Sequence, residues 1–188
     1  GRPFYILREA WNILNAIAEG KIESGDEKKL NALKGETMAV IALCQFDLTR
    51  CFGYPYTKDN GASLGAPLID HLVGTYENPS RSTVAQAYDF IIETLEEAVT
   101  LMSEEKNNGR MNKYAARALL ARVYLYHNDN RKAFDMAEQL IKDVDASGSY
   151  ALYPHEKYVA AWSVETKFGS ESFFEIANSV DDTPGRDS

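Results

Sequence analysis

The sequence predicts an all-α fold in which pairs of helices stack into a superhelix, with long ordered loops. Apolar residues recur at spacings of three and four over most of the chain, and this spacing is typical of amphipathic helices. Polar segments with Gly, Asn or Asp separate these stretches and supply helix stops and caps. With 188 residues, 45% of them hydrophobic, the chain is long enough to bury a sizeable core. We therefore expect one helical domain over residues 1–188, as part of a longer protein.

The first helix is predicted over residues 3–19, because Pro3 is tolerated in a first turn and Gly20 is a stop signal. Its apolar face consists of Tyr5, Leu7, Trp11, Leu14, Ile17 and Ala18.

The second helix is predicted from Glu27 to Phe52, and Gly53 ends it. The helical spacing assigns to its buried face Leu30, Leu33, Thr37, Ile41, Cys44, Leu48 and Cys51. We place Met38 and Phe46 partly to the side of this face. A glycine inside a helix costs roughly 1 kcal/mol relative to alanine. Gly35 therefore indicates either the close approach of a neighbouring helix or a kink.

The two cysteines lie seven residues apart in this helix. Their separation along the helix axis is about 10.5 Å, whereas a disulfide needs Cα atoms within roughly 7 Å of each other. We therefore expect Cys44 and Cys51 to be small buried residues on one face, not a disulfide.

A long loop, rich in Gly, Pro, Asn and Tyr, follows over residues 53–82. Loops of this length in compact domains are usually functional or disordered. The apolar stretches at 66–69 and 71–73 predict that this loop packs against the helices.

The third helix is predicted to begin after Thr83, which with Gln86 matches a capping box. Its apolar stripe consists of Val84, Ala87, Tyr88, Ile91, Leu95, Ala98, Val99 and Met102.

Residues 112–144 form the clearest helix pair, joined by the polar turn HNDNR. Aligned on a tetratricopeptide repeat, four residues fall where that repeat has Leu, a small residue, Tyr and Ala: Leu120, Ala121, Tyr124 and Ala133. The signature Trp, the later Phe and the closing Pro of the repeat are not matched. We expect Leu119, Leu120, Tyr124 and Ala133 to be buried. The apolar face of the second helix of the pair consists of Ala133, Ala137, Leu140, Ile141 and Val144.

Beyond this pair, residues 155–163 predict a short helix and residues 172–177 (SFFEIA) a short buried strand or extended segment.

Composition and motif content exclude several classes of function. The net charge of −8 offers no basic stripe for nucleic acid. No run of 18 apolar residues is present to span a membrane, and the first residues do not match a signal peptide. We expect no catalytic site, no metal site and no cofactor, because the chain contains no nucleophile elbow, phosphate-binding loop or CxxC motif. His71, His127 and His155 have no second His or Cys at metal-ligand spacing, so we expect surface or turn positions for them.

Aromatic residues outside the predicted helix faces are the candidates for ligand contact. Sugars are commonly held by flat aromatic faces together with planar hydrogen-bonding groups. The candidates are Tyr54, Tyr56 and Tyr76 in the long loop and Trp162 after the helix pair. The alternative for each is that it packs its segment against the helices.

Several stretches resemble the SusD/RagB family. Residues 34–57 are similar to a family stretch that reads roughly K-G-E-A-x-x-x-R-A-x-x-x-F-D-L-x-R-x-F-G-x-P-Y. The matching residues are Gly35, Glu36, Ala42, Phe46, Asp47, Leu48, Arg50, Phe52, Gly53 and Pro55. Residues 65–69, 81–98 and 109–133 resemble the family's G-V-P-L-V, R-x-T-V and G-R-x-x-K-x-A-A-x-A-L-L-A-R-V-Y-L-Y segments, in that order. Residues 170–176 resemble its S-E-x-I-F-E-I segment.

Two positions depart from the family pattern. Ile41 stands where the family often has Arg, so the chain must pack this site without the ion pair that an Arg could make. Asn130 follows the turn Asp where an aromatic residue is usual.

The resemblance implies a non-enzymatic, nutrient-binding component of an outer-membrane uptake system. Family members are lipid-anchored on the extracellular face of the outer membrane. There they act as a hinged lid on a SusC-like, TonB-dependent barrel and capture oligosaccharides or peptides. Their tetratricopeptide-like helices serve as a scaffold, and their ligand contacts come from loops and from a more variable C-terminal part. The alternative that the sequence leaves open is a tetratricopeptide-like adaptor that binds a partner protein.

Overall fold

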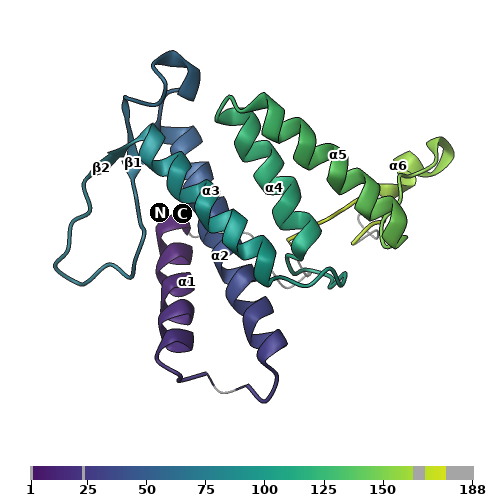
Figure 1. Ribbon diagram of the computed structural model, residues 1–188, viewed down its shortest axis with the longest axis horizontal. Helices are drawn as coiled ribbons and strands as arrows, with labels where there is room; N and C mark the ends of the chain where they lie inside the picture. The colour runs from purple at the N-terminus through teal and green to yellow at the C-terminus, as the bar shows by residue number, and fades with distance from the viewer. Residues whose placement is uncertain (1, 23, 163–167, 177–188) are drawn as a thin grey trace.

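A computed structural model describes residues 2–22, 24–162 and 168–176 (Figure 1). The long helices are α1 (Arg2–Ala18), α2 (Glu27–Phe52), α3 (Val84–Leu101), α4 (Lys113–Tyr126) and α5 (Asn130–Ser147). The short elements are η1 (Tyr56–Lys58), β1 (Leu64–Pro67), β2 (Arg81–Thr83), η2 (His155–Lys157) and α6 (Tyr158–Ala161). Residue 163 of the predicted short helix and residue 177 of the predicted strand lie outside the described residues.

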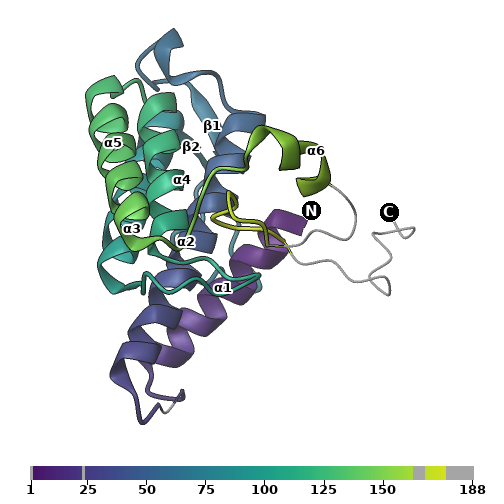
Figure 2. The ribbon, with the colours of Figure 1, turned by 90° about the vertical axis from the view of Figure 1, so that its right-hand side faces the viewer.

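The long helices form a stack in which each helix packs against the next one along the chain. The most extensive contacts are those of α2 with α3 and of α4 with α5 (Figure 1). This arrangement confirms the predicted all-α fold of stacked helix pairs, apart from one small two-stranded sheet. Figure 2 shows α6 standing away from α4 and α5.

Polar side chains cap the starts of four helices, of which those of α3 and α5 were predicted from the sequence. Asp26 accepts hydrogen bonds from the amides of Lys28 and Lys29 at the start of α2. The capping box of Thr83 and Gln86 begins α3. In the helix pair, Asn112 caps α4 and Asp129 caps α5. Each cap satisfies amides that have no partner inside the helix.

Helix α2 is buried on two sides, because α1 packs against one side and α3 against the other. Met38, Ala42 and Phe46 belong to the larger apolar cluster shared with α3 and α4. Ile41 and Leu48 belong to a second cluster with residues of α1 and of the long loop. The prediction that Met38 and Phe46 lie partly to the side of the buried face was therefore wrong: they are 7% and 0% exposed. A single stripe read from the sequence does not describe a helix with two neighbours.

Four residues predicted on apolar faces are exposed instead: Tyr5, Ala18, Cys51 and Ile141. Helix α5 has only α4 as an extensive helical neighbour within the described residues, so its buried stripe is narrow. Ile141 follows buried Leu140, and one residue turns a helix by about 100°, which points Ile141 to solvent. Cys51 lies in the last turn of α2 and Tyr5 in the first turns of α1, near the helix ends. Both cysteines are free, as predicted, although only Cys44 is partly buried.

The predicted long loop has its own structure. Strands β1 and β2 pair in antiparallel fashion, with an irregularity between the Leu64–Thr83 and Pro67–Arg81 pairs. Ala66 and Ile69 are buried against α1 and α2, so the prediction that the loop packs is confirmed. Residues 172–176, predicted as a strand or extended segment, have no regular secondary structure and are partly buried up to Glu175.

Candidate functional site

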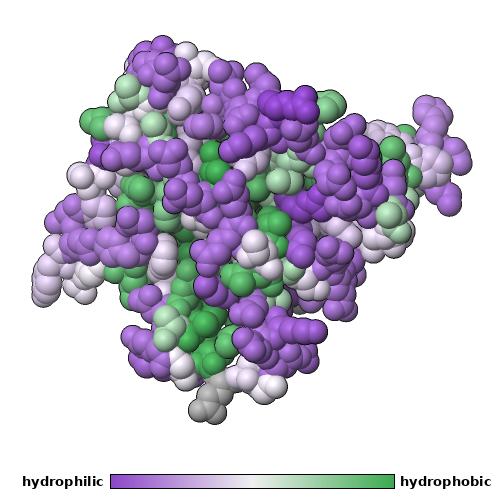
Figure 3. Space-filling model, viewed as in Figure 1, coloured by the Kyte–Doolittle hydropathy of each residue, from purple (hydrophilic) through white to green (hydrophobic). Residues whose placement is uncertain are grey.

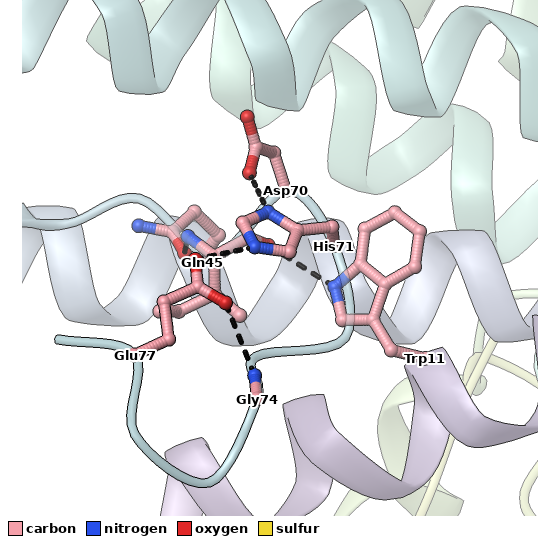
Figure 4. Close-up of polar contacts among 7 residues, drawn as sticks. Trp11, Gln45, Asp70, His71, Gly74 and Glu77 are labelled. Atoms are coloured by element: carbon pink, nitrogen blue, oxygen red, sulfur yellow. Dashed lines mark hydrogen bonds and ion pairs between the residues drawn. The ribbon is translucent and has the colours of Figure 1, made fainter. Parts of the chain in front are cut away.

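The loop between β1 and β2 is fixed to the helices at Ile69. Gln45, fully buried in α2, donates from Nε2 to the Pro67 carbonyl at 3.1 Å. Its Oε1 accepts the Ile69 amide at 3.3 Å. The indole N–H of Trp11 in α1 donates to the Ile69 carbonyl at 3.1 Å (Figure 4). Because buried polar groups need partners, these bonds fix where the outer part of the loop begins.

Beyond Ile69, His71 lies between two carboxylates (Figure 4). Its Nδ1 is 2.6 Å from Asp70 Oδ1, and its Nε2 is 2.7 Å from Glu77 Oε1. Glu77 Oε2 also accepts the Gly74 amide at 3.1 Å. The hydrogen bonds to Asp70 and Glu77 raise the pKa of His71. Those from the Gly74 amide and from His71 lower the pKa of the Glu77 carboxyl.

Two motif stretches that lie far apart in the sequence meet at Glu36. This α2 carboxylate accepts hydrogen bonds from the guanidinium of Arg110, including Nε at 2.9 Å, and from the Met111 amide at 3.1 Å. The paired hydrogen bonds give the contact a fixed orientation. Gly109, which precedes Arg110, has φ of +77°, a conformation that favours glycine.

Gly35 lies where α2 closely approaches the end of α3. A Cβ atom there would be 2.7 Å from Met102 Cγ and 2.9 Å from the Ala98 carbonyl oxygen. The close helix approach predicted for Gly35 is therefore confirmed.

A second pair of matched stretches meets at the small sheet. Arg81 donates from Nε to the Gly65 carbonyl at 2.7 Å and from Nη2 to the Leu64 carbonyl at 2.8 Å. Thr83, two residues later, caps α3. Arg81 thus connects β1 to the start of α3.

Of the predicted ligand-contact residues, Tyr56 packs inside the molecule. Its ring meets Tyr88 edge-on at 5.7 Å and lies 4.3 Å from the ring of His127, centre to centre. The Gly61 backbone, with φ of +75°, passes so close that an added Cβ would lie 2.8 Å from the Tyr56 ring. These contacts support the packing alternative for Tyr56.

The other candidates are exposed and lie on separate elements. Tyr54 is 58% exposed, and the Lys58 ammonium lies 3.1 Å from its ring centre. Tyr76 is 95% exposed in the loop beyond His71. Trp162 is 75% exposed just after α6. The face in Figure 3 is mostly hydrophilic, with apolar residues in a broken band over α1, α2 and α3.

Trp162 borders a hollow of about 520 Å³, whose other lining residues include Tyr153, Glu171 and Glu175. The two carboxylates hold the chain together around it. Glu171 accepts the Tyr153 amide, and Glu175 accepts the amides of Phe168 at 2.7 Å and Gly169 at 3.0 Å. Hydrogen bonds from the Ser172 side chain and these two amides lower the pKa of Glu175. The hollow therefore combines an exposed indole with carboxylates that are already partnered.

No helix in the described part of the chain has the length and apolar content needed to cross a bilayer. Within the same residues, His, Cys, Asp and Glu side chains form no group of three suited to a metal ion.

Comparison with known proteins decides the family. A family model described as SusD-like, "starch-binding associating with outer membrane", matches residues 4–125. The chain belongs to the SusD-like family. A search of curated proteins finds no match.

Solved SusD-like structures share the fold. A SusD superfamily protein from Bacteroides vulgatus is 95% identical, with a TM-score of 0.96 over 100% of this chain and 42% of its own. A SusD superfamily protein from Bacteroides thetaiotaomicron is 41% identical, with a TM-score of 0.87 over 93% of this chain and 37% of its own. The chain thus spans less than half the length of these relatives.

In this SusD-like chain, the matched motifs are contacts between elements. Glu36 and Arg110 connect α2 to the segment before α4, and Arg81 connects β1 to α3. Ile41 is 1% exposed in an apolar cluster that includes Leu7 and Leu48, so its site packs without a charge. The motifs that identify the family therefore hold the scaffold together.

Sequence reasoning missed the cluster of Asp70, His71 and Glu77. It predicted only a surface position for His71, which is correct for its exposure. The partner Glu77 lies six residues away, a spacing that matches neither a helix face nor a metal motif. The one sequence signal for the turn that brings His71 and Glu77 together is Gly74, which lies between them.

Proposed function

We propose that this chain is the helical scaffold of a glycan-binding lipoprotein on the extracellular face of the outer membrane. In this proposal, residues 1–188 form one SusD-like helical domain of a longer protein. That protein acts without catalysis as a lid on a SusC-like, TonB-dependent barrel. The observation that carries the proposal is the family match over residues 4–125, whose description names starch binding and the outer membrane.

The contacts around Glu36 and Arg81 support a scaffold role for the stack, because the matched residues use their polar atoms on neighbouring elements. Ligand contact is then left to the exposed aromatic residues Tyr54, Tyr76 and Trp162. An exposed ring offers a flat face for the C–H bonds of a sugar. Tyr56 is not among them, because its ring packs against Tyr88 and His127. The adaptor alternative has no contact in the described residues that favours it over the family assignment.

The test uses the protein expressed from its complete gene with an affinity tag in its native membrane. We expect a large TonB-dependent barrel to co-purify with it, and we expect the purified protein to be retained in gels containing a glycan. Recovery without a barrel, or retention by peptides and by no glycan, would contradict the proposal.

Variants Tyr54→Ala, Tyr76→Ala and Trp162→Ala then test the individual contacts. Phe134→Ala is the matched control, because Phe134 is a similarly exposed aromatic residue on α5 (59%). At least one candidate variant should weaken glycan retention while the control leaves it unchanged.

A further inference from the structure

The contacts of His71 identify its protonation state. Both ring nitrogens lie within 2.7 Å of carboxylate oxygens, on Asp70 and on Glu77. Carboxylates accept hydrogen bonds, and a neutral imidazole has only one N–H to donate. With one proton, one of the two short contacts would bring two lone pairs together. When both carboxyls are ionised, the arrangement therefore requires an imidazolium, with a proton on each nitrogen.

This imidazolium connects two parts of the same loop. The beginning of the loop is fixed at Ile69 by Gln45 and Trp11. Farther along, Glu77 closes a turn on Gly74, since the Gly74 amide donates to its carboxylate and the Gly74 carbonyl accepts its amide at 3.1 Å. His71 bridges from the fixed beginning to this turn (Figure 4).

We propose that Asp70, His71 and Glu77 form a proton-dependent latch, which holds residues 70–77 closed while His71 is protonated and releases them when it is not. The latch goes beyond the proposed function and does not depend on it. Its release would change the position of Tyr76, which lies inside the latched segment.

Charged groups on neighbouring elements also face His71. His71 and Arg8 of α1 line one apolar groove of about 290 Å³. His71 also lines an open hollow of about 660 Å³ together with Arg81 of β2 and with Asp89 and Glu93 of α3. The Arg81 guanidinium is occupied by carbonyls of β1. By the sign of their charges, the two α3 carboxylates are compatible with a positive His71 and Arg8 is not, but the groups that raise the pKa of His71 are Asp70 and Glu77.

The direction of the pH dependence follows from linkage. The pKa of His71 is raised above its ordinary 6.5, so its stabilisation is complete below about pH 6.5 and is lost as the pH rises through the raised value. The pKa of Glu77 is lowered below its ordinary 4.5, so its stabilisation is present above that pH and is lost as the pH falls through the lowered value. The latch is therefore closed in mildly acidic solution and opens as the pH rises through the raised pKa of His71.

The test combines a histidine titration with hydrogen exchange on the full-length protein. The His71 resonance, assigned by its loss in His71→Asn, should titrate at a higher pH than in the urea-unfolded chain. The exchange of amides in residues 72–77, corrected for intrinsic rates, should rise several-fold as the pH passes that midpoint.

Matched variants separate the latch from general effects of pH. Glu77→Gln should lower the His71 midpoint toward its unfolded value and remove the step in exchange. His155→Asn, at an exposed histidine of η2, should leave the step unchanged. Equal midpoints in the folded and unfolded chain, or exchange at 72–77 that shows no step, would overturn the latch.

Discussion

The helical stack and the segment after α5 differ in how far their aromatic side chains are buried. In the stack, Phe46 and Tyr88 are buried edge-on against each other, and the Glu36 carboxylate is bonded to a neighbouring element. In the segment after α5, Trp162 is 75% exposed just after a helix of four residues. The comparison indicates that the aromatic rings of the stack supply stability, whereas Trp162 presents exposed surface. Substitutions in the two regions should therefore differ sharply in their effect on unfolding.

The largest effect is expected from Phe46→Ala. The Phe46 ring is 0% exposed and meets Tyr88 at 6.2 Å and Tyr126 at 5.4 Å, between ring centres. Removing a buried phenylalanine leaves a cavity and costs about 3–5 kcal/mol of unfolding free energy. Urea unfolding followed by circular dichroism measures this loss. Point mutations cost about 1 kcal/mol on average. A smaller cost for Phe46→Ala would contradict the placement of this residue in the core.

The next effect is expected at Glu36. Glu36→Ala leaves the Met111 amide without its acceptor and removes the partner of Arg110. The expected loss of unfolding free energy is about 1.5–3 kcal/mol, because hydrogen bonds to charged groups lie in that range. Glu36→Gln is the matched control: its amide oxygen can still accept one bond, so it should lose less stability than Glu36→Ala but more than none. If Glu36→Gln keeps the full stability of the parent, the charged carboxylate is not what holds the contact.

Gly35→Ala should have a smaller effect. It should destabilise the protein, although alanine favours a helix more than glycine does. Alanine would gain about 1 kcal/mol in an isolated helix. Here its Cβ would lie 2.9 Å from the Ala98 carbonyl, which belongs to the backbone and cannot move cheaply. We expect a net destabilisation of up to about 2 kcal/mol, since overpacking costs about 1–3 kcal/mol and the helix propensity of alanine recovers about 1 kcal/mol of it. A stabilised Gly35→Ala variant in the same urea series would contradict the close approach.

The stack was largely predictable from the sequence, for local reasons. The capping box at Thr83 and the buried positions of Leu119, Leu120, Tyr124 and Ala133 follow from spacing and cap chemistry within one helix or turn. Errors arose where burial depends on the number of neighbours that a helix has. Phe46 is buried because α2 has two helical neighbours, and Ile141 is exposed because α4 is the one helix that α5 packs on extensively within the described residues.

The candidate site was less predictable, because its residues meet through long-range contacts. Tyr56 packs with Tyr88 and His127, which lie 32 and 71 residues away in the sequence. The bond between Gln45 and the Ile69 amide spans 24 residues. Periodicity carries no information about such pairs. Exposure of Tyr76 and Trp162 was consistent with their candidacy but could not be read from residue type.

The smallest effect on stability is expected from Trp162→Ala. The indole is 75% exposed, and its described ring partner is Tyr158 at 6.1 Å between ring centres. Substitutions on the surface usually change the unfolding free energy by no more than about 0.5 kcal/mol. Measured on this chain, the variant should therefore unfold with the parent. A loss of several kcal/mol would place Trp162 in a core instead of on a surface, and the packing alternative would then apply to it as it does to Tyr56. Unchanged stability together with weaker glycan retention by the full-length variant would instead show that Trp162 contributes to binding and not to folding. Phe46 in the stack is expected to behave in the opposite way.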